Sequence, residues 1–224
     1  MVLHAFTVPV LNVLNLLASC LLLISFAMLS ERRTPRLITL FAGQGTILFI
    51  STCLIAHSSG LHELYYSAAL TLLLKVIGLP LILRRLIYRL DAQWDSEPLV
   101  NVPLTMLAGL ALVIFAFGLA QPISMMATTI TRNMLGIALA VILLSFLMMI
   151  TRRKAVTQVI GFLAMENGLF FAATSATYGM PMVIELGIAL DVLVGVFILG
   201  LFFFQIREQF ESLDLRNMEN LKEE

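Results

Sequence analysis

The chain has 224 residues, of which 60% are hydrophobic and only 12% are charged. Soluble domains average about 45–50% apolar and roughly 25% charged residues, so this composition predicts an integral membrane protein. The 14 Lys and Arg residues balance the 14 Asp and Glu residues. A net charge of zero does not supply the basic surface that nucleic-acid binding requires, so no nucleic-acid partner is expected.

Apolar runs long enough to cross a bilayer recur along the whole chain. A hydrocarbon core about 30 Å thick needs about 20 apolar residues per helix, and polar or Gly- and Pro-containing breaks separate these runs. We therefore predict an all-α membrane domain over residues 1–224. Its seven transmembrane helices are expected at 9–29, 36–57, 64–83, 101–121, 133–150, 155–178 and 182–206.

The basic residues predict the orientation of these helices. Twelve of them follow the first, third, fifth and seventh helices, on one side of the membrane, and only Arg132 lies on the other. By the positive-inside rule, we expect the N-terminus outside and the C-terminus in the cytoplasm. The chain then divides into four parts. Residues 1–90 contain the first three helices, and residues 91–129 contain a cytoplasmic loop and the fourth helix. Residues 130–206 contain the last three helices, and residues 207–224 form a cytoplasmic tail.

Four ionisable residues lie inside the predicted helices: Lys75, Glu166, Glu185 and Asp191. At 1.5 Å per residue, Glu185 is only about 6 Å from a helix end, whereas the other three are about 15 Å or more inside, near mid-bilayer. A charge at the helix centre costs roughly 2.5–3.5 kcal/mol on insertion scales, and such residues mark ion or proton pathways.

Three acids cannot all pair with one lysine, so at least one carboxyl group should be protonated or lie beside water. Burial disfavours charged forms, whereas a close opposite charge favours them, and groups held between these effects can exchange protons near neutral pH. We predict that Lys75, Glu166, Glu185 and Asp191 form a proton or ion pathway. The alternative is that Lys75 only neutralises one acid and fixes helix packing.

We find no sequence motif for a cofactor, a metal ion or a catalytic centre in this chain. Cys20 and Cys53 lie in apolar runs without CxxC or Cys/His spacing, and we interpret them as small hydrophobic residues of helices. The Gly43-Gln44-Gly45 run favours close helix packing over a nucleotide site. His57 and His62 flank a predicted loop and are interpreted as interfacial loop residues.

Three segments resemble a known family. They are Ala164-Met165-Glu166-Asn167-Gly168, the Glu185 to Asp191 run ELGIALD, and TLLLKVIGLPLILRR around Lys75. All three resemble the hydrogenase-4 E family of membrane proteins, from the formate hydrogenlyase type of group 4 NiFe hydrogenase complexes. Residues 130–206 are also similar to the small K subunit of respiratory complex I. Asp191 falls on its second membrane glutamate, whereas its first falls three residues before Glu166, at Leu163.

The resemblance implies a non-redox membrane-arm subunit of a complex that couples electron transfer to movement of H⁺ or Na⁺. It implies no cofactor in this chain, and a NiFe centre and Fe–S clusters in partner subunits. The expected partners are antiporter-like and hydrogenase-anchoring membrane subunits in a bacterial or archaeal cytoplasmic membrane. Two alternatives stay open: a subunit of a cation/proton antiporter or an independent ion transporter, and a structural scaffold without an ion path.

Overall fold

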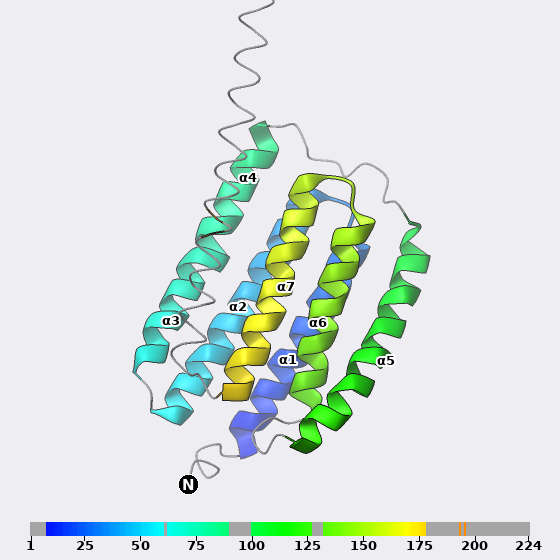
Figure 1. Ribbon diagram of the computed structural model, residues 1–224. Coiled ribbons are helices and arrows are strands. Elements are labelled where there is room, and N and C mark those ends of the chain that lie inside the picture. The colour runs from blue at the N-terminus through cyan, green and yellow to red at the C-terminus, as the bar shows by residue number, and fades with distance from the viewer. Residues whose placement is uncertain are drawn as a thin grey trace, which may run out of the picture.

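The computed structural model describes residues 8–60, 62–89, 100–126 and 132–177, together with residues 193 and 195. The elements in these ranges are helices (Figure 1). They are α1 (Val8–Ser30), α2 (Thr34–Ser59), α3 (Glu63–Thr71), α4 (Leu79–Arg89), α5 (Val102–Met126), α6 (Arg132–Thr151) and α7 (Ala155–Thr177). A π-helical segment, η1 (Leu72–Gly78), joins α3 to α4.

Six described stretches are long and apolar enough to cross a membrane. They are Val10–Ser30, Thr34–Ser59, Leu64–Tyr88, Val102–Pro122, Asn133–Thr151 and Val156–Ser175. This result confirms an all-α membrane protein and six of the predicted spans. Apart from residues 193 and 195, the predicted span 182–206 and the tail 207–224 lie outside the described residues. The seventh helix therefore stays a prediction, as does the orientation of the termini.

Two helices continue beyond the predicted ends of their spans. The third span was expected to end at residue 83, but α3, η1 and α4 continue without a break to Arg89, so Arg84 and Arg85 are helical. Long arginine side chains can extend away from an apolar segment toward water, which lets a helix continue past the hydrocarbon core. The fourth candidate membrane span ends at Pro122, within one residue of the predicted end, but helix α5 itself runs through Pro122 to Met126.

Pro122 does not end α5, because the backbone hydrogen bonds that a proline disturbs lie close to the end of the helix. A proline removes one backbone hydrogen bond and crowds the carbonyl group four residues earlier. Only four residues of α5 follow Pro122, so few backbone bonds depend on the turn that it disturbs. The interpretation of proline as a helix boundary was therefore off by about one turn.

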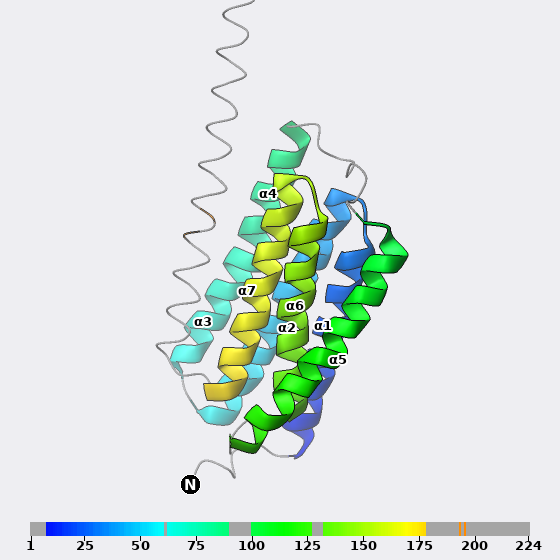
Figure 2. The ribbon, with the colours of Figure 1, turned by 45° about the vertical axis from the view of Figure 1, so that its right-hand side comes forward.

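The helices form a bundle centred on α1, α2, α6 and α7 (Figure 1). Helix α2 packs against α1, α7 and the continuous α3–η1–α4 helix, while α6 packs against α1, α5 and α7. Helix α5 and the α3–α4 helix therefore lie at opposite edges of the bundle (Figure 2). The outer side of α5 exposes a row of large apolar side chains: Leu104, Leu107, Leu110, Ile114, Phe115 and Leu119.

The turn between α2 and α3 lies at one end of the bundle. Gly60 ends α2 in the left-handed conformation, with φ of 68°, and its N–H donates to the carbonyl of Ala56 at 3.0 Å. Glycine adopts this conformation without the steric cost of a Cβ atom. His57 and His62 are exposed on either side of this turn. The prediction that both are loop residues is confirmed for His62, whereas His57 lies in the last turn of α2.

The buried apolar side chains form two clusters at different levels of the bundle. One contains Met28, Phe41, Leu83 and Met148, and the other contains Leu14, Leu48, Leu64, Val141 and Phe171. Apart from Gly45 and Gly168, the buried residues that come between these clusters along α1, α2, η1 and α7 are polar. We call them the polar layer: Ser25, Gln44, Lys75, Glu166 and Asn167.

Candidate functional site

The polar layer contains a buried ion pair between Lys75 of η1 and Glu166 of α7. The Lys75 Nζ atom donates a hydrogen bond to Glu166 Oε1 at 3.1 Å, across 91 residues of sequence. The two side chains are 1% and 5% exposed. The structure thus brings together the two predicted pathway residues that it describes.

Lys75 is positioned by η1, and its side chain contacts α7. Lys75 lies inside η1, whose wider π-helical turn is a feature often found at functional sites. Its Nζ atom also lies 5.2 Å from the centre of the Phe170 ring, which is one turn beyond Glu166 on α7. A cation over an aromatic face is stabilised by the ring's electron density. Helix α7 therefore offers Lys75 both a carboxylate and an aromatic ring.

Helix α2 approaches η1 closely beside this pair. A Cβ atom at Gly45 would lie 3.1 Å from Lys75 Cβ and 3.3 Å from its carbonyl carbon. The absence of a side chain at Gly45 is therefore what lets the two backbones approach. A Cβ atom at Gly43 would meet only Ile24 Cδ1, at 3.5 Å, which is ordinary van der Waals contact. Close packing, predicted for this glycine pair, is confirmed most clearly at Gly45.

This difference gives a matched pair of variants. We expect Gly45→Ala to unfold at a lower temperature than Gly43→Ala, because crowding a packed interface costs about 1–3 kcal/mol. Both variants gain the same helix propensity, so the comparison isolates the crowding at Lys75. Thermal unfolding of the purified chain in detergent, followed by circular dichroism, measures the difference. Equal midpoints would show that α2 and η1 can separate at no cost.

Three neutral residues of the polar layer form a second connection between helices. Gln44 Nε2 donates to Ser25 Oγ at 2.9 Å, and Gln44 Oε1 accepts a hydrogen bond from Asn167 Nδ2 at 3.3 Å. Ser25 Oγ in turn donates to the carbonyl of Leu21 at 2.9 Å. These bonds link α1, α2 and α7 beside the ion pair. Buried polar groups in a membrane helix require such partners.

Sequence reasoning did not select Ser25, Gln44 and Asn167 as site residues. The available signal was an amide or hydroxyl side chain inside a long apolar run, which needs a partner on a neighbouring helix. Glu185 and Asp191 lie outside the described residues, so their place in the site stays a prediction. Cys20 and Cys53 are free thiols in α1 and α2. In the ranges that the structure describes, no three His, Cys, Asp or Glu side chains gather at a metal site.

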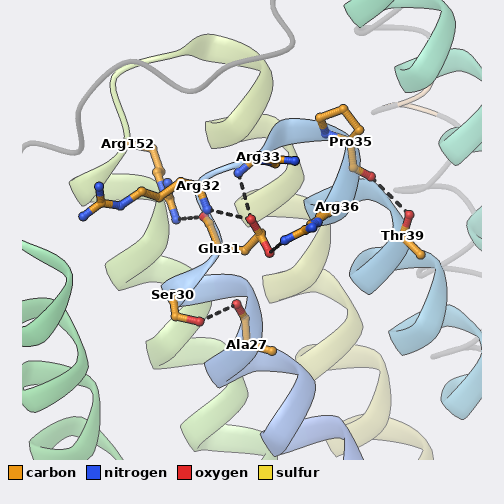
Figure 3. Close-up of polar contacts among 9 residues, drawn as sticks. All are labelled: Ala27, Ser30, Glu31, Arg32, Arg33, Pro35, Arg36, Thr39 and Arg152. Atoms are coloured by element: carbon orange, nitrogen blue, oxygen red, sulfur yellow. Dashed lines mark hydrogen bonds and ion pairs between the residues drawn. The ribbon is translucent and has the colours of Figure 1, made fainter.

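A second buried cation lies at the basic end of the bundle. Arg152, between α6 and α7, is only 3% exposed, although it is one of the basic residues counted after the fifth predicted helix. Its Nη2 atom donates to the carbonyl oxygen of Glu31 (Figure 3). It also donates to the carbonyl of Leu29 at 3.1 Å, with a longer bond to that of Met28 at 3.4 Å. A cation at a helix C-terminus satisfies free carbonyl groups and complements the helix dipole. Arg152 thus caps α1.

The segment between α1 and α2 is ordered by Glu31 (Figure 3). Its Oε1 atom accepts hydrogen bonds from the backbone N–H groups of Arg32, at 3.1 Å, and Arg33, at 3.0 Å. Its Oε2 atom lies 3.6 Å from Arg36 Nη1. The loop that Arg152 contacts is therefore held by its own carboxylate, so the arginine binds a defined set of carbonyl groups.

The chain resembles known proteins over almost its whole length. An uncharacterized protein of Mycobacterium tuberculosis (strain ATCC 25618 / H37Rv) is 31% identical over 207 residues, which cover 92% of this chain and 94% of the relative. Hydrogenase-4 component E of Escherichia coli (strain K12) is 25% identical over 211 residues, covering 94% of this chain and 97% of the relative. The Shigella flexneri protein of that name gives the same values. No family model and no solved structure matches the chain.

Proposed function

The chain belongs to the family of hydrogenase-4 component E, and on this premise we propose that it is a membrane subunit of a hydrogenase-4-type complex. In that complex it contributes buried protonatable groups to the translocation of H⁺ or Na⁺ coupled to electron transfer. The observation that carries this proposal is the buried ion pair between Lys75 and Glu166.

Both members of the pair lie near the middle of a candidate membrane span. Lys75 is 11 residues from Leu64 and 13 from Tyr88 within one span, and Glu166 is 10 residues from Val156 and 9 from Ser175 within another. Ionisable groups at this depth are costly and characteristically mark ion or proton paths. A buried ion pair is also weak evidence for stability, because apolar side chains of the same volume often pack as well or better. Both arguments favour transport over packing.

The chemistry of the pair fits stepwise proton transfer. While Lys75 and Glu166 are 3.1 Å apart, each supplies the counter-charge that makes the other's charged form tolerable in a low-dielectric interior. A charge arriving in a neighbouring subunit can separate the pair. The carboxylate then lacks its counter-charge, and uptake of a proton neutralises it. Return of Lys75 favours release of that proton. For Na⁺, the same carboxylate is a suitable oxygen ligand.

Buried polar atoms near the pair support a hydrated path. Asn167 Oδ1 is buried and accepts no hydrogen bond within the described ranges, and the same is true of Ser67 Oγ on α3. Water is a common partner of such groups, because leaving them without one is costly. Ser67, Thr71 and Lys75 follow at intervals of four residues and are all buried, so polar groups continue from the pair toward the α2–α3 turn.

The remaining expectations extend the proposal beyond the described residues. Asp191 provides a further station near mid-membrane, and Glu185 connects it toward the outer face. Residues 130–206 act like the K subunit of respiratory complex I. The NiFe centre and Fe–S clusters belong to partner subunits, and antiporter-like and hydrogenase-anchoring membrane subunits are the neighbours. The complex lies in a bacterial or archaeal cytoplasmic membrane, with the N-terminus of this chain outside.

Affinity purification of the tagged chain in mild detergent, followed by mass spectrometry, tests the assignment to this complex. We expect NiFe and Fe–S proteins to be recovered together with antiporter-like membrane proteins, and none of them from cells that express the untagged chain. Recovery of the chain alone, or with antiporter subunits only, would contradict the hydrogenase assignment. It would favour an independent transporter or a subunit of a cation/proton antiporter.

A further inference from the structure

A pocket of about 210 Å³ lies where α2 begins and α4 ends. This place is the common end of two candidate membrane spans, Thr34–Ser59 and Leu64–Tyr88. The pocket therefore lies at the level where lipid headgroups meet the hydrocarbon core. Its lining combines cationic, hydroxyl and apolar side chains: Arg36, Ile38, Thr39, Arg84, Ile87 and Tyr88.

The Arg84 guanidinium group is held at this pocket by a neutral partner. Its Nη2 atom donates to Thr39 Oγ1 at 3.2 Å, and Thr39 Oγ1 donates to the carbonyl of Pro35 at 3.1 Å. Within the described part of the chain, the ion pairs involve other residues, and no carboxylate pairs with Arg84. The charge of Arg84 is therefore positioned without being neutralised there.

The second cation of the pocket is only weakly engaged. Arg36 lies 3.6 Å from Glu31, and its side chain is 64% exposed. Exposed ion pairs of this kind contribute little free energy, so Arg36 can turn toward a stronger anion. Glu31 keeps its two backbone N–H donors when that happens. Two guanidinium groups can thus meet one anion, and phosphate oxygens match their planar donor geometry.

An apolar surface leads away from the pocket toward the middle of the membrane. Leu73, Ile77 and Leu81 are exposed and follow at intervals of four residues along η1 and α4. Arg84 and Tyr88 follow after intervals of three and four residues, so all five residues lie toward one side of the helix. Tyr88 is exposed at the end of the span, where tyrosine is enriched in membrane proteins. A ligand that fits both parts has an anionic head and an apolar tail.

We propose that this pocket binds the phosphate group of an anionic phospholipid. Arg84 and Arg36 bind the phosphate oxygens, Thr39 fixes the position of Arg84, and an acyl chain lies along Leu81, Ile77 and Leu73. Basic pockets between membrane helices bind lipid headgroups by the same electrostatics. This inference does not depend on the proposed role in ion translocation.

Native mass spectrometry of the full chain, released from detergent with added lipid, tests the proposal. We expect phosphatidylglycerol to be retained and phosphatidylcholine to be lost. Arg84→Gln should weaken phosphatidylglycerol binding about tenfold, the effect of one charged hydrogen-bonding group. Arg153→Gln is the matched control, because Arg153 is exposed near the same end but does not line the pocket, and it should leave binding unchanged.

Three results would overturn the proposal: equal retention of the two lipids, equal loss of binding in both arginine variants, or displacement of phosphatidylglycerol by millimolar inorganic phosphate. Displacement by inorganic phosphate would show that the pocket binds anions without recognising the rest of the lipid. If Arg84→Gln fails to fold, Thr39→Val provides the test instead. It keeps both charges but removes the hydroxyl that positions Arg84, so binding should weaken less than tenfold. Wild-type binding in that variant would contradict the proposed geometry.

Discussion

Replacement of Glu166 by glutamine should abolish coupled ion translocation in the assembled complex. Glutamine has nearly the same shape as glutamate and can still accept a hydrogen bond from Lys75, but it cannot take up and release a proton. We expect at least a tenfold loss of ion transport per complex. The measurement is ion uptake into inverted membrane vesicles during redox turnover, normalised to the amount of assembled complex.

Two comparisons make this result specific. Glu166→Asp keeps the carboxyl group on a shorter side chain and should retain part of the transport. Asp191→Asn should lower transport in the same way as Glu166→Gln if both acids belong to the path. Wild-type transport in an assembled Glu166→Gln complex would show that this carboxyl group has no role in translocation.

Replacement of Arg152 by alanine should cause the largest loss of stability. Arg152 donates to carbonyl oxygens in the last turn of α1 and the loop after it. Its removal leaves these buried acceptors without their donor and the end of α1 without its cation. We expect a loss of about 3 kcal/mol, because each buried carbonyl group left without a donor costs about 1–3 kcal/mol. Denaturant unfolding of the purified chain in mixed micelles, followed by circular dichroism, measures it.

The neighbouring residue provides the control for this prediction. Arg153 carries the same charge in the same loop but is exposed, so Arg153→Ala should change stability by no more than about 0.5 kcal/mol. Arg152→Lys should recover only part of the loss, since an ammonium group lacks the planar fork of donors that reaches several carbonyl groups. Equal effects of the two alanine variants would mean that the loop charge, and not the cap on α1, matters.

The sequence predicted which ionisable residues are unusual but not how they meet. Lys75 and Glu166 stand out because a charge in the middle of an apolar run is costly wherever the helix packs. Their pairing across 91 residues depends on which helices are neighbours, and the order of helices along the chain does not determine that. The π-helical turn at Lys75 also leaves no simple mark in an apolar sequence.

The burial of Arg152 could not be predicted from the sequence, although its position at the basic end of the bundle could. Counting basic residues correctly grouped it with the other basic residues near Arg33 and Arg84 at one end of the bundle. The count treats all loop arginines alike, yet Arg152 is buried against α1 and Arg153 is exposed. Burial of a loop residue depends on the tertiary position of the loop, which hydropathy does not describe. Helix ends at Arg89 and Met126 were missed because arginine and proline were interpreted as breaks.

The measurement that tests the central claim most directly is ion transport by the double variant Lys75→Gln/Glu166→Gln in vesicles that contain the assembled complex. Removing both charges avoids leaving one buried charge alone, so a complex in which the pair only stabilises packing should assemble and transport ions as the wild type does. Our account predicts normal assembly with transport still lost. Transport at the wild-type level in this variant would contradict a role for the pair in translocation and would favour a structural scaffold.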